Sequence, residues 1–175
     1  FMHNKSILIY IKLLRERIII YPYLVLFLLT FFHGFCNYIW LSQNQMSPIW
    51  DEGGHLLTAL KYKDFFLRSR LFDFKSFAEI GGYYPPLFPI SGLVLNSVWG
   101  SSIKVMAMTN IIYMAIMLFS VFKIGELIFD RKTGLLAAFI LSMFPVIFGT
   151  SRMFLLDYAL TAMVTLSIYL LFLTD

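Results

Sequence analysis

The sequence has 175 residues, of which 59% are hydrophobic and only 14% are charged, whereas an average soluble domain has about 25% charged residues. Together with a mean hydropathy of +0.78, this composition excludes a water-soluble globular domain and a disordered tail. The net charge of +4 does not indicate nucleic-acid binding, because the basic residues stand at the ends of apolar runs rather than on a polar surface. The single cysteine, Cys36, excludes an intramolecular disulfide and a multi-cysteine metal site.

The first apolar run covers residues 18–40. At 1.5 Å per residue it is long enough to cross a hydrocarbon core of roughly 30 Å. It is longer than the apolar region of a signal peptide, and no small-x-small cleavage site follows it. Residues 1–17 carry a single acidic side chain against four basic ones, Lys5, Lys12, Arg15 and Arg17. We therefore predict a transmembrane helix whose N-terminal segment is cytoplasmic.

Residues 103–175 are predicted to hold three further transmembrane helices. Their apolar runs are 105–122, 135–150 and 158–173. Pro145 is predicted to kink the middle run, and the last two runs are near the lower length limit for a span. The intervening turn at 123–134 contains Lys123, Arg131 and Lys132, which the positive-inside rule places in the cytoplasm. The predicted fold class is therefore all-α, a polytopic membrane protein with four transmembrane helices. Because the chain ends directly after an apolar run, we expect it to be a fragment of a longer protein.

The segment 41–102 is predicted to be a long first loop on the outer side of the membrane. Four leucines within it fall on one helical face, Leu56, Leu60, Leu67 and Leu71, with charged residues on another face. Such a helix is expected to lie in the membrane interface rather than to cross the membrane. The apolar stretch 90–99 is too short to span and predicts a second interfacial or re-entrant helix.

Three scarce acidic residues are candidate catalytic groups on the predicted outer face. Asp51 and Glu52 follow the first span, and Asp157 precedes the last one. A carboxylate in such a place can act as the general base toward an incoming hydroxyl group. The alternative for Asp51 is an N-cap of the following helix, and for Asp157 an acid that the helix dipole favours.

Two basic residues near these acids are candidate substrate contacts. His55 lies four residues after Asp51, a spacing that suits metal ligands on one helical face, although no third ligand is evident. Alternatively, His55 forms a hydrogen bond with a substrate, or it is simply a histidine at the membrane interface. Arg152 can grip a phosphate with two parallel hydrogen bonds or extend toward lipid headgroups. His33, within the first span, is interpreted as a helix-packing contact, although a polar residue at membrane depth also marks function.

The order of several short motifs resembles one enzyme family. Asp51-Glu52 after the first span is followed by Tyr-Pro-Pro-Leu at 84–87, by Leu-Ile-Phe-Asp-Arg at 127–131 leading into Gly-Leu-Leu-Ala-Ala at 134–138, and by Ser151-Arg152 with Asp157. From about residue 50 onward the chain resembles the N-terminal part of the multispanning C-type glycosyltransferases. It is most similar to the branch that holds the lipid A aminoarabinose transferases and the protein O-mannosyltransferases.

The resemblance implies transfer of a sugar from a polyprenyl-phosphate donor to a lipid, glycan or protein acceptor. It implies an enzyme of the inner (cell) membrane whose active site faces outward, with Asp51, Glu52 and Asp157 at that site. Where the aminoarabinose branch commonly has a lysine before the two prolines, this chain has Tyr84, so the phosphate contact is expected to pass to Arg152. The resemblance implies no cofactor, and it leaves open whether the enzyme uses a divalent metal. The alternative is a transporter or carrier-lipid flippase segment without catalysis, and a further rival is a structural subunit of a membrane complex.

Overall fold

The structure is a computed structural model that describes residues 2–45, 47–49, 51–68, 73–100 and 102–174, with side chains from residue 21 onward. All regular secondary structure in these residues is helical. In chain order the helices are α1 (Met2–Gln43), α2 (Asp51–Leu67), α3 (Phe74–Gly81), α4 (Leu87–Trp99), α5 (Ile103–Ala107), α6 (Asn110–Ile128), α7 (Arg131–Met143), α8 (Pro145–Thr150) and α9 (Leu156–Leu171). The predicted all-α class is thus confirmed.

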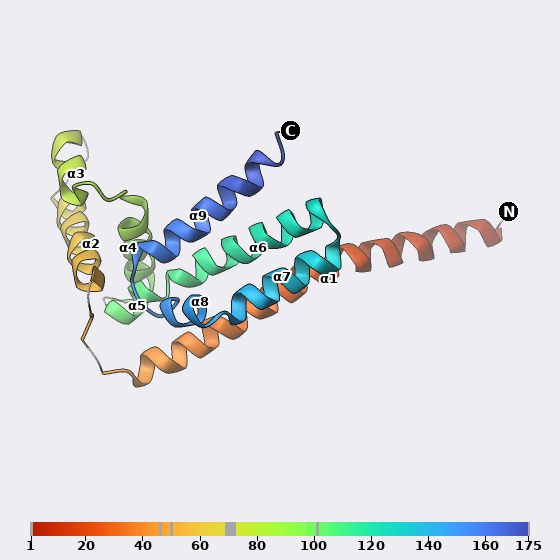
Figure 1. The fold of residues 1–175 in the computed structure, drawn as a ribbon, viewed down its shortest axis with the longest axis horizontal. Coiled ribbons are helices and arrows are strands. Elements are labelled where there is room, and N and C mark those ends of the chain that lie inside the picture. The colour runs from red at the N-terminus through yellow and green to blue at the C-terminus, as the bar shows by residue number, and fades with distance from the viewer. Residues whose placement is uncertain (1, 46, 50, 69–72, 101, 175) are drawn as a thin grey trace.

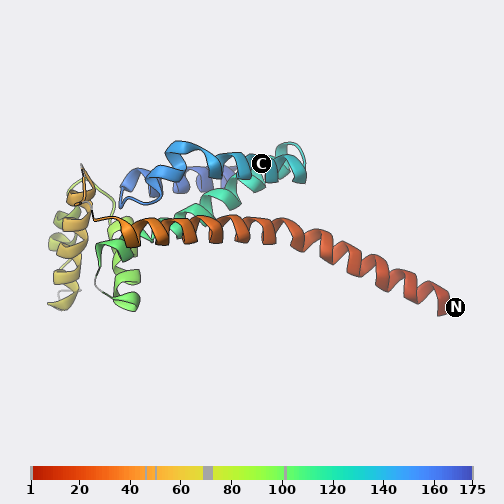
Figure 2. The same ribbon diagram turned by 90° about the horizontal axis from the view of Figure 1, so that it is seen from below.

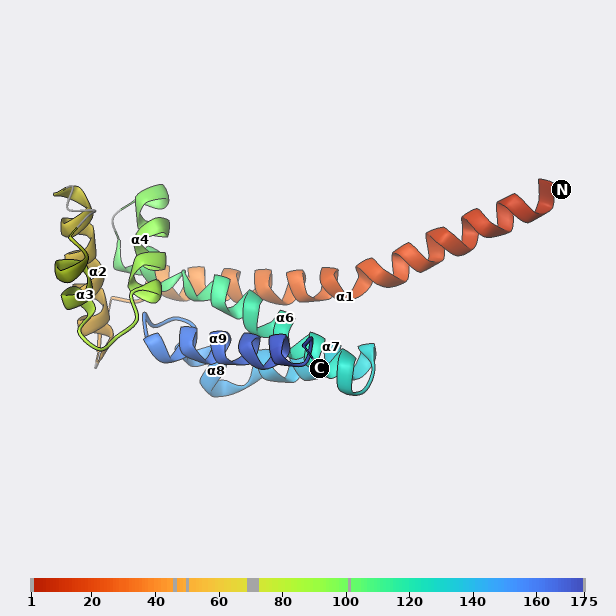
Figure 3. The same ribbon diagram turned by 90° about the horizontal axis from the view of Figure 1, so that it is seen from above.

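The helices form two groups with different directions. Helices α1, α6, α7 and α9 run roughly along the long axis of the molecule, and α2, α3 and α4 cross this direction at one end (Figures 1 and 3). The N-terminus and the turn between α6 and α7 lie toward the opposite end (Figure 2). If the long helices cross a membrane, the crosswise helices lie near its surface, where interfacial helices are expected.

Two helical segments of the described chain are long and apolar enough to span a membrane, Tyr21–Gln43 and Ile103–Ile128. The helix predicted to be kinked at Pro145 is instead broken there. Helix α7 ends at Met143, Phe144 has an extended backbone (φ −64°, ψ 126°), and Pro145 begins α8. The proline ring disfavours the helical conformation of the residue before it and suits the first position of a helix.

Helix α2 is the first crosswise helix, and its buried side differs from the predicted leucine face. The buried residues are Glu52, His55, Leu56, Ala59, Tyr62 and Phe65. Leu60 and Leu67 are 50% and 74% exposed, whereas Leu71 lies outside the described residues. The helix therefore uses its mixed polar and aromatic side for packing and leaves two of the four leucines on its exposed surface.

Helices α6 and α7 approach each other closely at two glycines. A β-carbon built on Gly125 would lie 2.6 Å from the Cα atom of Gly134, which is closer than real β-carbons approach backbone atoms. Small residues at helix crossings allow this approach, as they do in many membrane proteins.

We expect Gly125→Val to lower the stability of the protein by about 1–3 kcal/mol, because the added side chain must push α7 away. Thermal unfolding in detergent measures the effect. Gly149→Val is the matched control, since a β-carbon there meets nothing within 4 Å. Equal melting temperatures for the two variants would contradict the close contact between α6 and α7.

Candidate active site

Two of the predicted acids stand in the first turns of helices that begin toward the crosswise end of the molecule. Asp51 is in the first turn of α2 and Asp157 is in the first turn of α9. Both side chains are exposed. These groups are therefore open to a ligand that approaches this end of the helices.

His55 links the two acids electrostatically. Its imidazole is buried, and this burial lowers the pKa of His55 below the ordinary value, although the carboxylates of Asp51 and Asp157 both act to raise the pKa. Both carboxylates therefore lie near the same ring. With a lowered pKa, His55 is neutral at pH 7 and has one donor and one acceptor nitrogen.

Tyr84 completes this group from the segment between α3 and α4. Its ring contacts the His55 ring edge to face, with centroids 5.1 Å apart. A hydrogen bond with the Tyr83 hydroxyl (3.3 Å) raises the pKa of Tyr84, and the negative charges of Asp51 and Asp157 contribute to the same shift. His55 and Tyr84 thus contact each other, and the charges of Asp51 and Asp157 act on both.

Glu52 has a different environment from its neighbour Asp51. Its side chain is buried, and Oε1 accepts a hydrogen bond of 2.9 Å from the backbone N–H of Phe154. The Phe154 ring is fully buried and stacks on Phe88 at 4.3 Å. Gly92 makes room for it, since a β-carbon there would lie 2.6 Å from the ring. These contacts join α2 and α4 to the connection that leads into α9.

Arg152 lies in the same connection but faces α1. Its Nε donates a hydrogen bond of 3.2 Å to Oδ1 of Asn37. The guanidinium carbon lies 4.2 Å from the centroid of the Phe148 ring and 5.5 Å from that of Trp40. Within the described residues Arg152 makes no ion pair with the candidate acids, so it forms a separate contact point at this end of the protein.

Two asparagines that hold this connection were missed by the sequence analysis. Asn37 of α1 bonds Ser151, and Nδ2 of Asn110 in α6 donates to the backbone carbonyl of Met153 (2.6 Å). Both asparagines are fully buried. A polar residue inside an apolar run is a functional signal, and Asn37 carries this signal in the sequence as His33 does.

The structure also shows the surroundings of His33 and the side chains that could join His55 in a metal site. His33 is fully buried in α1, and its ring contacts Phe148 edge to face at 5.1 Å, consistent with helix packing. No group of three or more His, Cys, Asp or Glu side chains that could hold a metal ion occurs in the described ranges. The pair of Asp51 and His55 therefore has no third protein ligand among them.

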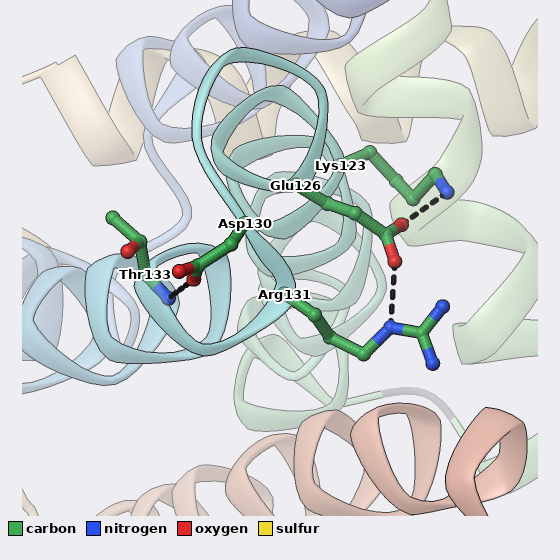
Figure 4. Close-up of polar contacts among 5 residues, drawn as sticks. All are labelled: Lys123, Glu126, Asp130, Arg131 and Thr133. Atoms are coloured by element: carbon green, nitrogen blue, oxygen red, sulfur yellow. Dashed lines mark hydrogen bonds and ion pairs between the residues drawn. The ribbon is translucent and has the colours of Figure 1, made fainter.

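A second charged cluster lies at the other end of the long helices. Glu126 accepts hydrogen bonds from Nζ of Lys123 (2.6 Å) and from Nε of Arg131 (2.8 Å), while Asp130 caps α7 through the backbone N–H of Thr133 (2.7 Å), as Figure 4 shows. These contacts close the turn between α6 and α7. The turn lies at the opposite end of the long helices from α2 and from the start of α9 (Figure 1).

The helical fold and the two apolar segments long enough to span a membrane are typical of an integral membrane protein, and the polar groups at the crosswise end form its candidate ligand site. Residues 84–174, more than half of the chain, match the sequence profile of the dolichyl-phosphate-mannose-protein mannosyltransferases. The chain belongs to this family of membrane glycosyltransferases, which use polyprenyl-phosphate-linked sugars. The predicted resemblance is confirmed. No curated protein and no solved structure matches the chain.

The matched segment includes only part of the candidate site. Tyr84, Arg152 and Asp157 lie within it, whereas Asp51, Glu52 and His55 precede it. The contacts between α2 and the matched segment, above all the Glu52–Phe154 hydrogen bond, are what bring the two sets of residues together.

Proposed function

We propose that this chain forms the N-terminal part of an enzyme that transfers a sugar from a polyprenyl-phosphate carrier to an acceptor hydroxyl group. The observation that supports the proposal most is the contact of His55 with Tyr84, two groups from different segments whose pKa values both respond to the charges of Asp51 and Asp157. A carrier of this kind keeps its chain in the lipid and its phosphate and sugar at the membrane surface. A site at the ends of the helices suits that geometry.

The reaction that we propose is a single displacement at the anomeric carbon. Asp51 accepts the proton of the acceptor hydroxyl, whose oxygen forms a bond to the anomeric carbon as the bond from that carbon to the carrier phosphate breaks. The phosphate leaves as an anion and needs no proton, so one base suffices where glycosidases use two carboxyl groups. The electron pair of the broken bond stays on the departing phosphate.

The other site residues are assigned supporting roles in this proposal. Asp157, whose charge acts on His55 as that of Asp51 does, orients the acceptor or the donor sugar. Neutral His55 and the hydroxyl of Tyr84 offer hydrogen bonds to sugar hydroxyl groups. Tyr84 is 36% exposed and can therefore reach a ligand. Glu52 and Arg152 complete the set, with Arg152 as the contact for the carrier phosphate.

We further propose that four segments cross the inner membrane, with the candidate acids on its outer face. The crossings are α1, α5–α6, α7–α8 and α9, of which the last two are short and need flanking residues to span. The N-terminus and the α6–α7 turn lie away from the crosswise helices (Figure 2), and the sequence of that turn region includes Lys123, Arg131 and Lys132. Basic residues at one end of a helical bundle favour the cytoplasmic side for that end.

The proposed orientation predicts which positions a membrane-impermeant thiol reagent reaches in intact cells. In a Cys36→Ala background, we expect the Glu79→Cys variant to be labelled from outside and the Lys132→Cys variant to be labelled only after the cells are permeabilised. Both native side chains are exposed, so accessibility within the protein does not limit either reaction. The opposite pattern would place the acids in the cytoplasm and contradict the proposed topology.

The proposed activity is tested with membranes that contain the complete protein. We expect radiolabelled sugar to move from a polyprenyl-phosphate-linked donor to a hydroxyl-bearing acceptor in these membranes, and not in membranes without the protein. Movement of the intact donor across the bilayer without sugar transfer would instead support the flippase alternative. Transporters place their polar residues near the middle of the membrane, whereas the candidate acids here lie at the ends of the helices.

A further inference from the structure

Asn37 of α1 forms side-chain hydrogen bonds with two consecutive residues of the connection before α9. Its Nδ2 donates to Oγ (2.9 Å) and to the backbone carbonyl (3.2 Å) of Ser151, and its Oδ1 accepts from Nε of Arg152 (3.2 Å). A carbonyl can only accept a hydrogen bond and a guanidinium nitrogen can only donate one. These two partners therefore fix which end of the Asn37 amide faces Arg152.

Asn37 therefore fixes the position of the Arg152 guanidinium group without neutralising its positive charge, because an amide is uncharged. Asn37 accepts a hydrogen bond from Nε of the guanidinium group, and the central carbon of this group lies over the rings of Phe148 and Trp40. The terminal nitrogens donate no hydrogen bond to any residue that the structure describes. A planar guanidinium with its outer edge free matches the spacing of two phosphate oxygens.

We infer that Asn37 is a positioning residue for carrier binding, which aims the free edge of Arg152 at the phosphate of the polyprenyl carrier. The inference rests on the proposed function and assigns to Asn37 a role beyond holding the helices together. A neutral amide suits this role because it orients the guanidinium while it leaves the positive charge to the ligand. An acidic residue in its place would form an ion pair with Arg152 and compete with the phosphate.

The test measures binding of two probes to the complete protein in nanodiscs, a radiolabelled polyprenyl monophosphate and the corresponding polyprenol without the phosphate. We expect wild type to prefer the phosphate, and Asn37→Ala to lower this preference about tenfold, as the loss of one hydrogen bond to a charged group does. Asn37→Asp is expected to lower it at least as much, because the new carboxylate pairs with Arg152. If Asn37→Ala does not fold, Asn37→Asp, which has nearly the same shape, carries the test.

A double-mutant cycle and a control variant separate positioning from a merely structural role. In an Arg152→Gln background, we expect Asn37→Ala to change the preference for the phosphate no further. Asn110→Ala removes hydrogen bonds to the same connection without touching Arg152, so it is expected to lower the melting temperature but not the preference of the folded protein. An equal effect of Asn37→Ala in both backgrounds, or an equal effect of Asn110→Ala, would overturn the inference. A wild-type protein with no preference for the phosphate would contradict the proposed function itself.

Discussion

Asp51→Asn is expected to lower the rate of sugar transfer on the order of 10²-fold or more, while the protein inserts and folds as the wild type does. The substitution keeps the shape of the side chain and removes the group that accepts the proton. Asn also caps helices about as well as Asp, so any contribution of residue 51 to the start of α2 is retained. The measurement is the transfer rate at saturating donor and acceptor, with thermal unfolding of the same preparations.

The structure supports this separation of activity from stability. The Asp51 side chain is exposed, in contrast to the neighbouring Glu52, so removing its charge exposes no buried partner. Asp157→Asn is the matched variant, because Asp157 is also exposed and also lies near His55. We expect a smaller loss of activity there. Wild-type turnover in Asp51→Asn would leave Asp51 as a helix-capping residue and remove it from the mechanism.

The sequence predicts the helical fold well where long apolar runs decide it. The first run and the run that begins at residue 105 correspond to the two segments long enough to span a membrane. The sequence analysis predicts a kink rather than a break at Pro145, although the effect of a proline on the residue before it is a local rule. For α2, the leucine pattern predicts a face that is largely exposed, because contacts with α3, α4 and Phe154 select a different face for burial.

The sequence predicts which residues belong to the candidate site, but not the hydrogen bonds that connect them. Counting the membrane crossings places Asp51 and Asp157 on one side, and the structure brings both near His55. The roles of Glu52 and Asn37 depend on hydrogen bonds to partners 102 and 115 residues away in sequence. No local periodicity encodes such a pairing, since it depends on how the helices pack.

Replacing Glu52 is therefore expected to have the second large effect on sugar transfer. The hydrogen bond to Phe154 predicts that Glu52→Ala is far more damaging than Glu52→Gln. In Glu52→Ala the backbone N–H of Phe154 loses its partner in a buried place, which costs about 1–3 kcal/mol of stability. The α2 end that carries Asp51 also loses its link to the connection that carries Asp157. A displacement of about 1 Å between reacting groups can reduce a rate about 10²-fold, and we expect a loss of transfer of this size.

Glu52→Gln distinguishes a linking role from a chemical one. The amide oxygen of Gln can accept the same hydrogen bond from the Phe154 N–H, but it cannot take up a proton in the reaction. If Glu52 links α2 to the connection before α9, Glu52→Gln should retain most of the transfer rate and most of the melting temperature, while Glu52→Ala loses both. If Glu52 itself transfers a proton, both variants should lose activity to a similar degree, and Glu52→Gln should do so with an unchanged melting temperature. The ranking of Gln against Ala at this one position thus decides whether the acidic pair at the start of α2 contains two catalytic carboxylates, or one carboxylate and the residue that holds it in place.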